Sequence, residues 1–249
     1  MATLCARVLK LHIDAVFTSE LYGDGFAAHL TRGLCATHPG AAPVQHVLVD
    51  LERRAAPISS TALRSNLWRH WRHLPSRVAR TLVRRIAFLG GESSGKTVLA
   101  ARLARDLDTG CAGEYGRELW EVKKGRLAYE DMVVIAREQV RREEGALEAA
   151  RAFVFCDTSP LTTLFYSLEM FGQAEPELLL AAQRTYSMVV LCAPDFPFVQ
   201  DGTRRDDAFR HRQHAWYEAQ FAARGISYVT ARGSLGERTR FVRGLLGAE

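Results

Sequence analysis

The sequence predicts an α/β fold in which a parallel sheet carries helices on both faces. Two observations lead to this prediction, and a third predicts a division into two domains. From residue 84 onward, short apolar runs of strand length alternate with segments of helical length. The first of these runs ends in a glycine-rich loop that leads directly into a helical segment. Residues 1–82 differ, because their short apolar runs are separated by turn-forming residues, and we therefore expect two domains, 1–82 and 83–249.

The second domain contains the regular alternation of elements. Short apolar runs beside turn-forming residues predict strands at 85–89, 153–156, 188–192 and 227–230. Helical length and periodicity predict helices at 96–107, 132–150, 160–170, 176–184, 206–223 and 235–246. Ligands of parallel sheets bind beyond the carboxyl ends of the strands, so we expect functional residues at that edge.

The loop after the first of these strands has the pattern G-x-x-x-x-G-K-[ST]. Its residues are Gly90, Gly91, Glu92, Ser93, Ser94, Gly95, Lys96 and Thr97. The glycines let successive backbone N–H groups point at phosphate oxygens, and the helix that follows adds its positive end. We expect Lys96 to reach the β- and γ-phosphates of ATP and the Thr97 hydroxyl to bind Mg²⁺. Between a strand and a helix, this motif predicts an ATP-binding P-loop.

A carboxylate follows the second of the predicted strands. Asp157 comes directly after 153–156, which places it near the phosphates at the carboxyl edge of the sheet. There it could accept the proton of a substrate hydroxyl or hold Mg²⁺ through water. The alternative is that Asp157 caps the next helix through Thr158 and Ser159.

Two further polar segments complete the expected site. In the stretch EYGRE (114–118), at a helix start, we expect Glu114, Tyr115 and Arg117 to bind the substrate together with Asp157 and Thr158. Tyr115 could stack on a flat base or a pyridinium ring, and the carboxylates could bond a ribose. The alternative is a charged helix start with one part-buried tyrosine.

The stretch DGTRR (201–205) follows the third strand after a proline-rich turn. We expect Asp201, Arg204 and Arg205 to form a lid, in which the arginines close over the phosphates and neutralise their charge. The alternative is that these arginines, and Arg212 further along the chain, lie on a solvent-exposed basic helix. We favour this alternative for Arg212. Gly233, after the last strand, is a weaker candidate for a loop near an adenine ring.

Composition narrows the class of protein. The net charge of +5 suits a phosphate-rich ligand and also permits nucleic-acid binding, but the arginines are spread along the chain. We find no helix-turn-helix segment and therefore expect no nucleic-acid partner. Five scattered cysteines without a C-x-x-C pair argue against a disulfide framework and a zinc site, and favour the cytoplasm. No apolar stretch has the length of a membrane span.

Together these segments resemble one family, the bifunctional nicotinamide-mononucleotide adenylyltransferase/ribosylnicotinamide kinases of the NadR type. The matching stretches are IAFLGGESSGKTVLAARLA, EYGRE, FCDTSPLTTLFYS and DGTRR. The resemblance covers 84–249 and implies that ATP phosphorylates the 5′-hydroxyl of nicotinamide riboside, giving nicotinamide mononucleotide. It also implies that Gly90 to Thr97 bind ATP, that Asp157 is the base or a Mg²⁺-linked acid, and that Arg204 belongs to the lid. We therefore expect Lys96, Asp157 and Arg204 to be the catalytic residues. One position departs, since Ser159 stands where the family pattern has a second Asp, and this puts substrate choice in question.

The first domain resembles only the second half of the family's Rossmann-like nucleotidyltransferase domain, in the stretches VFTSELYG, HVLVD, PISSTALR and WRHWRHLP. Ser59, Thr61 and Arg64 fit its I-S-x-T-x-x-R pattern, a capped helix start with an arginine suited to a triphosphate. An ordinary capped helix would fit as well. The family's H-x-G-H motif occurs nowhere in the chain, and the first strand and helix of that domain are not found. We therefore expect no adenylyltransferase activity.

The reason for this incomplete domain stays open between a shortened gene start, a remnant and a separate chain that supplies the other half. Whether the chain forms a homo-oligomer also stays open. A kinase for another nucleoside and a non-catalytic ATP-binding sensor or scaffold are the alternatives to the riboside kinase. Lys96, Thr97, Asp157 and Arg204 favour catalysis, because binding alone would not require all of them.

Overall fold

The computed structural model describes residues 12–198 and 205–248. The chain divides into two compact units, Met1–Arg64 and Ser65–Glu249. The sequence placed this boundary after residue 82, and the difference has a packing cause. Trp71 is buried in the core of the second unit, and the Trp68 ring lies 5.5 Å from the ring of Phe153. The segment 65–82 therefore belongs to the second unit.

The first unit is built on a β–α–β arrangement. Strands β1 (Ala15–Thr18) and β2 (Gln45–Leu48) pair in parallel, and helix α1 (Gly23–Cys35) connects them. Its small core consists of Ala27, Leu30, Leu34 and Val44. Helix α2 (Ser60–Ser65) lies at the end of the unit and reaches one residue past its boundary. A parallel pair with a crossover helix is the arrangement expected for a partial Rossmann-like domain.

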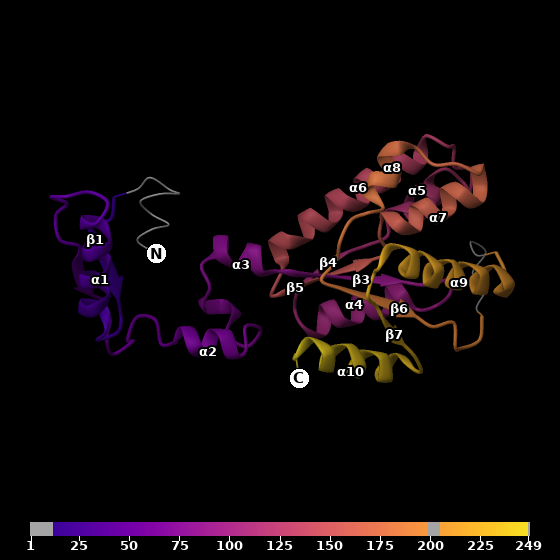
Figure 1. Ribbon diagram of the computed structural model, residues 1–249. Coiled ribbons are helices and arrows are strands. Elements are labelled where there is room, and N and C mark those ends of the chain that lie inside the picture. Colours follow the sequence, from indigo (N-terminus) through magenta and orange to yellow (C-terminus); the bar gives the residue numbers. More distant parts are fainter. Residues whose placement is uncertain (1–11, 199–204, 249) are drawn as a thin grey trace. The chain divides into compact units, whose positions relative to one another are not determined.

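The second unit contains a five-stranded parallel sheet in the order β4-β5-β3-β6-β7 (Figure 1). Its strands are β3 (Arg84–Leu89), β4 (Gly110–Ala112), β5 (Phe153–Asp157), β6 (Met188–Cys192) and β7 (Val229–Ala231). The four predicted strands are all present. The edge strand β4 was not predicted, because three residues, Gly-Cys-Ala, give no readable alternation.

The other elements of the second unit are helices, several of which pack on the sheet. They are η2 (Trp71–His73), α3 (Ser76–Leu82), α4 (Lys96–Asp106), α5 (Tyr115–Val122), α6 (Asp131–Gly145), η3 (Ala146–Ala149), α7 (Pro160–Phe171), α8 (Pro176–Ala181), α9 (Asp207–Arg224) and α10 (Leu235–Leu246). The helix predicted over 132–150 ends at Gly145 and continues as a short 3₁₀ turn.

Alternating residues of the central strands form two cores, one on each face of the sheet. Ile86 and Phe88 of β3 pack with Leu99 and Leu103 of α4 and with residues of α10. The neighbouring Leu89 packs on the other face with residues of α6, α7, α8 and α9. This period of two is what a strand buried on both faces requires. Figure 1 shows α5 to α8 and α10 on opposite sides of the sheet. The predicted α/β class is thus confirmed.

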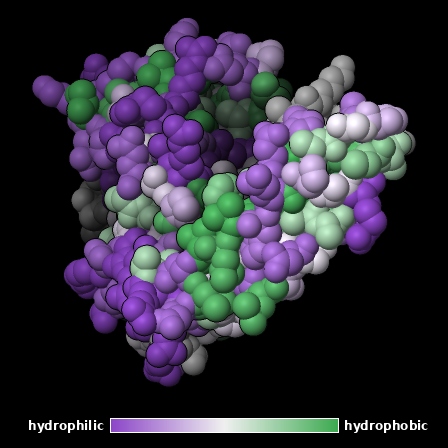
Figure 2. Space-filling model, turned by 90° about the vertical axis from the view of Figure 1, so that its left-hand side faces the viewer, coloured by the Kyte–Doolittle hydropathy of each residue, from purple (hydrophilic) through white to green (hydrophobic). Residues whose placement is uncertain are grey.

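The surface in the view of Figure 2 is mostly hydrophilic, with one strip of hydrophobic side chains near its centre. Within the first unit, exposed hydrophobic residues occur in and just after its two strands: Phe17, Val47, Leu48, Val49 and Leu51. Among the helices of 12–198 and 205–248, none combines the length and the apolar character of a membrane span.

Candidate functional site

The P-loop lies at the carboxyl end of the central strand β3 and leads into α4. Gly90, Ser93 and Gly95 have φ angles of 142°, 53° and 79°. Position 90 requires glycine for two reasons. Its φ angle disfavours any side chain, and a Cβ there would lie 2.6 Å from the carbonyl oxygen of Cys192. The backbone curls tightly between the sheet and the helix start, as a phosphate-binding loop requires.

Lys96 and Thr97 are the first two residues of α4. The Lys96 Nζ donates to the carbonyl oxygen of Gly91 at 2.9 Å, so its ammonium group folds back over the loop. Thr97 is exposed. Both side chains lie at the positive end of the helix, where an anion is stabilised.

Asp157 ends β5 directly beside β3, opposite Phe88 in the register. Its side chain is buried, and neither carboxylate oxygen has a hydrogen-bond partner among the residues that the structure describes. Burial raises the pKa of Asp157, and the nearby charge of Lys96 opposes that rise. The nearby Thr97 hydroxyl also lowers this pKa, but it does not form a hydrogen bond of good geometry to either oxygen. A buried carboxylate left in this state is unusual in a folded protein, and indicates a group that meets a ligand or an ion.

The capping alternative for Asp157 is not what the structure shows. Ser159 is the N-cap of α7, and its Oγ accepts the backbone N–H of Leu161 at 3.2 Å. Ser159 is 2% exposed. Because serine and aspartate both cap helices well, Ser159 keeps a capping role at the position of the family's second Asp.

The residues present fit Mg²⁺. The ion is usually held by one or two protein oxygens, with the rest of its ligands coming from phosphates and water. The orphaned carboxylate of Asp157 and the hydroxyl of Thr97 supply oxygens of that kind. Within the described ranges, no group of three or more His, Cys, Asp or Glu side chains could hold a metal without phosphates.

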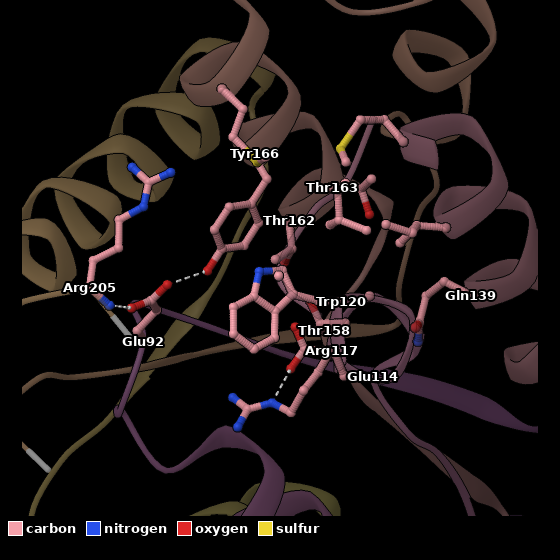
Figure 3. A pocket seen from close by; sticks show the side chains of 16 residues that line it. Glu92, Glu114, Arg117, Trp120, Gln139, Thr158, Thr162, Thr163, Tyr166 and Arg205 are labelled. Atoms are coloured by element: carbon pink, nitrogen blue, oxygen red, sulfur yellow. Dashed lines mark hydrogen bonds and ion pairs between the residues drawn. The ribbon is translucent and has the colours of Figure 1, made fainter. Parts of the chain in front are cut away.

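A cavity of about 320 Å³ opens beside the P-loop (Figure 3). It is lined by α5, α6, α7 and the loops between them, and its walls are partly polar and partly apolar. The lining residues are Glu92, Glu114, Gly116, Arg117, Trp120, Gly125, Leu127, Met132, Ile135, Gln139, Thr158, Thr162, Thr163, Tyr166, Met170 and Arg205. The size suits a nucleoside rather than a macromolecule.

Glu92 belongs to both the P-loop and this cavity. Its carboxylate accepts the Tyr166 hydroxyl at 2.9 Å and the backbone N–H of Arg205 at 2.8 Å. Its own backbone N–H donates to the Gln213 side chain at 2.9 Å. One loop residue thus connects α7, the start of the α9 segment and the phosphate site, as the dashed lines in Figure 3 show in part.

Glu114 and Arg117, both expected to bind substrate, line the cavity and face each other at 3.7 Å between Nε and Oε2. Burial, reinforced by the negative charge of Asp157, raises the pKa of Glu114. Thr158 also lines the cavity, and its hydroxyl is buried without a partner in the described part of the chain. The backbone of Thr158 has a φ of +79°, a strained value of the kind that accumulates at functional sites.

The aromatic residue at the cavity wall is not the predicted one. Tyr115 does not line the cavity; its ring packs in the core and lies under the guanidinium of Arg142 at 4.8 Å. Trp120 lines the cavity instead, and Tyr166 joins it from α7. The signal for Trp120 was present, since it follows Arg117 by three residues and therefore shares its helix face.

Of the predicted lid, Asp201 and Arg204 lie outside the described residues. Arg205 lines the cavity, and its guanidinium contacts Glu169 at 3.3 Å and the Phe209 ring at 4.3 Å. Arg212 is exposed on α9, as the alternative reading had it.

Arg238 of α10 was not predicted, yet it connects three loops at the nucleotide site. It is 2% exposed, and its guanidinium donates to the carbonyl oxygens of Ser94 (2.7 Å), Ala193 (2.9 Å) and Gly233 (2.9 Å). It also pairs with Asp195, which accepts the backbone N–H of Gly233 at 2.7 Å. The loop around Gly233 is thereby fixed to the P-loop.

Replacing Arg238 by methionine should lower the free energy of unfolding by about 3 kcal/mol, because buried carbonyls and a carboxylate lose their donor. Urea unfolding followed by circular dichroism measures this. Arg240→Met is the control, since Arg240 is exposed on the same helix, and it should change the value by less than about 0.5 kcal/mol. Equal stability of the two variants would contradict the role given to Arg238.

The predicted residues of the first unit lie on or beside α2. The Ser59 Oγ accepts the backbone N–H of Ala62 at 3.0 Å and so caps the helix. Thr61 and Arg64 lie on α2 itself. A nucleotide-binding role for these three residues stays a prediction.

The central P-loop, the parallel sheet and the buried carboxylate on the neighbouring strand define a P-loop nucleotide-binding protein of the kinase or transferase class. The chain belongs to the AAA domain family, whose model matches residues 85–238. Over 166 residues, or 65% of this chain, it is 34% identical to the trifunctional NAD biosynthesis/regulator protein NadR of Salmonella typhimurium. NadR of Escherichia coli gives the same identity over the same length. The resemblance to the NadR family that the motifs predicted is therefore confirmed. The chain spans 40% of the length of these relatives.

Two solved NadR structures share the fold. One, in complex with NR, has a TM-score of 0.68 and 24% identity, covering 96% of this chain and 71% of that one. The other, in complex with NAD and AMP-PNP, has a TM-score of 0.67 and 20% identity, covering 100% of this chain and 74% of that one.

Proposed function

We propose that this chain phosphorylates nicotinamide riboside with ATP and Mg²⁺, giving nicotinamide mononucleotide for NAD biosynthesis. The observation that carries the proposal is a nucleoside-sized cavity with acidic and aromatic walls beside a P-loop lysine and an unpartnered buried aspartate. Homology to NadR, whose name includes NAD biosynthesis, and the fold shared with a NadR that binds NR support it. We also propose a reducing, cytoplasmic setting, which the five scattered cysteines without a C-x-x-C pair support.

The wall of the cavity suits a positively charged ring. The rings of Trp120 and Tyr166 extend into it in Figure 3, and Glu92 and Glu114 bring carboxylates. A pyridinium ring combines a flat aromatic face with a positive charge, so it gains from both stacking and electrostatic attraction. A neutral base would gain only from the stacking.

In the proposed reaction, the 5′-hydroxyl oxygen forms a bond to the γ-phosphorus while the bond from that phosphorus to the β,γ-bridging oxygen breaks. The hydroxyl proton passes to the carboxylate of Asp157, and ADP leaves. Lys96 stabilises the charge on the phosphates. Thr97 would hold Mg²⁺, which neutralises phosphate charge when bound, and Asp157 would meet the ion only through water, so that its carboxylate stays able to take the proton. Arg204 is proposed to act from the lid.

The direct test is incubation of the protein with ATP, Mg²⁺ and nicotinamide riboside, with chromatography to follow nicotinamide mononucleotide, beside a panel of other nucleosides. Turnover of the riboside above all others supports the proposal. If only another nucleoside is phosphorylated, the protein is still a kinase, but nicotinamide riboside is not its substrate. ATP binding without any turnover would favour the sensor or scaffold instead. We also propose that the chain lacks adenylyltransferase activity, because it contains no H-x-G-H motif.

Replacing Trp120 by alanine should raise KM for nicotinamide riboside about 10- to 100-fold, the usual loss when an aromatic stacking partner of a base is removed. KM for ATP should stay within about threefold, and Trp120→Phe should recover most of the loss. Steady-state kinetics with each substrate varied in turn measures both constants. An unchanged riboside KM in Trp120→Ala would remove Trp120 from the site.

A further inference from the structure

Gln139 is a buried polar residue of the cavity that the proposed mechanism does not use. It lies on α6 and lines the cavity, and its side chain is almost fully buried, at 1% exposure. Its Oε1 accepts the backbone N–H of Tyr115 at 3.1 Å. This contact identifies the two ends of the amide, because an N–H donor requires the oxygen rather than the nitrogen.

The other end of the amide carries two N–H donors. The Nε2 of Gln139 is buried and has no partner among the residues that the structure describes. An unpaired buried donor costs about 1–3 kcal/mol, and folded proteins keep few of them. Because Gln139 borders the cavity, a ligand that packs against it and brings an acceptor to the amide, with a small shift of the side chain, would remove the cost.

The position of Gln139 indicates which part of a nucleoside it meets. Met132, Ile135 and Gln139 line the cavity along one face of α6, so the wall changes from apolar to polar toward Gln139. The amide contacts the backbone of Tyr115, the residue that follows Glu114, and the Glu114 side chain lines the same cavity. The apolar end suits the base, and the polar end suits the sugar.

A sugar hydroxyl matches this pair of side chains because it is both a donor and an acceptor. Its oxygen can accept from the Gln139 amide while its proton is donated to the Glu114 carboxylate. A sugar carbon without the hydroxyl would leave both side chains unpaired, and sites of this kind reject analogues that lack the group.

We infer that Gln139 is a specificity-determining residue that, with Glu114, binds a ribose hydroxyl and makes the enzyme select ribonucleosides over deoxyribonucleosides. The inference rests on the proposed function only in requiring a nucleoside as acceptor. It adds a selection on the sugar that is independent of the identity of the base.

The test compares nicotinamide riboside with its 2′-deoxy and 3′-deoxy analogues in the wild type and two variants. Gln139→Glu keeps an oxygen for the Tyr115 N–H and replaces the amide donor, whereas Gln139→Leu removes both groups. Gln183→Glu, an exposed glutamine outside this cavity, is the matched control. Thermal unfolding and the KM for ATP confirm that each variant is folded.

The wild type and Gln183→Glu should prefer the riboside over at least one deoxy analogue by about 100-fold in kcat/KM, and both Gln139 variants should reduce that ratio at least tenfold. The reduction should come from a higher KM for the riboside, with the deoxy analogue little affected. A wild type that accepts both deoxy analogues as well as the riboside, or a ratio that survives in both variants, would overturn the inference. If another nucleoside is the substrate, the riboside proposal fails, and the same comparison with the deoxy forms of that nucleoside decides the role of Gln139. If no nucleoside is phosphorylated, both proposals fail.

Discussion

Replacing Lys96 by alanine is expected to lower kcat/KM about 100-fold or more, while the protein stays folded. Its ammonium group lies over the P-loop, where charge accumulates on the transferred phosphoryl group, and preorganised positive groups at such positions contribute on the order of 100- to 1000-fold. Initial rates under saturating Mg²⁺ measure the effect.

Lys124→Ala is the control for this substitution, because Lys124 is exposed and lies beyond the end of α5. It should retain nearly the full rate. Retention of activity within about threefold in Lys96→Ala would remove this loop from the chemistry.

Replacing Asp157 by asparagine is expected to lower kcat by about 100-fold or more, since an amide cannot accept the hydroxyl proton and general-base groups contribute on the order of 10²- to 10⁴-fold. Asp108→Asn, at a side chain that is 85% exposed, is the control. Single-turnover kinetics with ATP in excess isolates the chemical step. An unchanged single-turnover rate would exclude Asp157 as the base.

The same substitution should stabilise the ligand-free protein. Because burial raises the pKa of Asp157 above its ordinary value of 3.8, the folded chain binds this proton more tightly than the unfolded chain. The free energy of unfolding therefore falls as the pH rises from the unfolded pKa through the folded pKa, and the cost of the buried charge is complete above that range.

Asp157→Asn should remove this fall and raise the free energy of unfolding by about 1–3 kcal/mol above the folded pKa. Urea unfolding of the ligand-free protein at a series of pH values tests it. If the variant is no more stable than the wild type at any pH, then neighbouring groups already offset the free-energy cost of burying this charge, and the prediction is wrong. Loss of activity together with a gain in stability would mark Asp157 as a residue retained for chemistry.

The parts of the fold that sequence reasoning predicted are those with a strong local signal. The runs 86–89, 153–156 and 188–192 are apolar throughout and lie in the three central strands. Strand β4 was missed because its three residues carry no pattern and are held by pairing with β5. The segment 65–82 was assigned to the wrong unit because the packing of Trp71 against distant strands is a tertiary property.

The candidate site was predicted where it depends on a motif and missed where it depends on packing. The P-loop and Asp157 follow from short patterns after strands. Arg238 contacts Ser94, which lies 144 positions away in the chain, and no local pattern encodes that contact. Gln139 on α6 reads as one polar residue in a charged helix until α5 is placed beside it. Its role depends on a neighbour rather than on its own surroundings in the sequence.

The double attachment of Glu92 has a consequence for the order of events. One carboxylate bonds Tyr166 in the acceptor cavity and the backbone of Arg205, while its own backbone is part of the phosphate loop. Any acceptor that shifts Tyr166 therefore acts on the loop that holds the nucleotide. Thermodynamic linkage makes such an influence mutual, so each substrate alters the affinity of the other by the same factor. The two substrates would then bind as a coupled pair, and the affinity measured for either one depends on whether its partner is already bound.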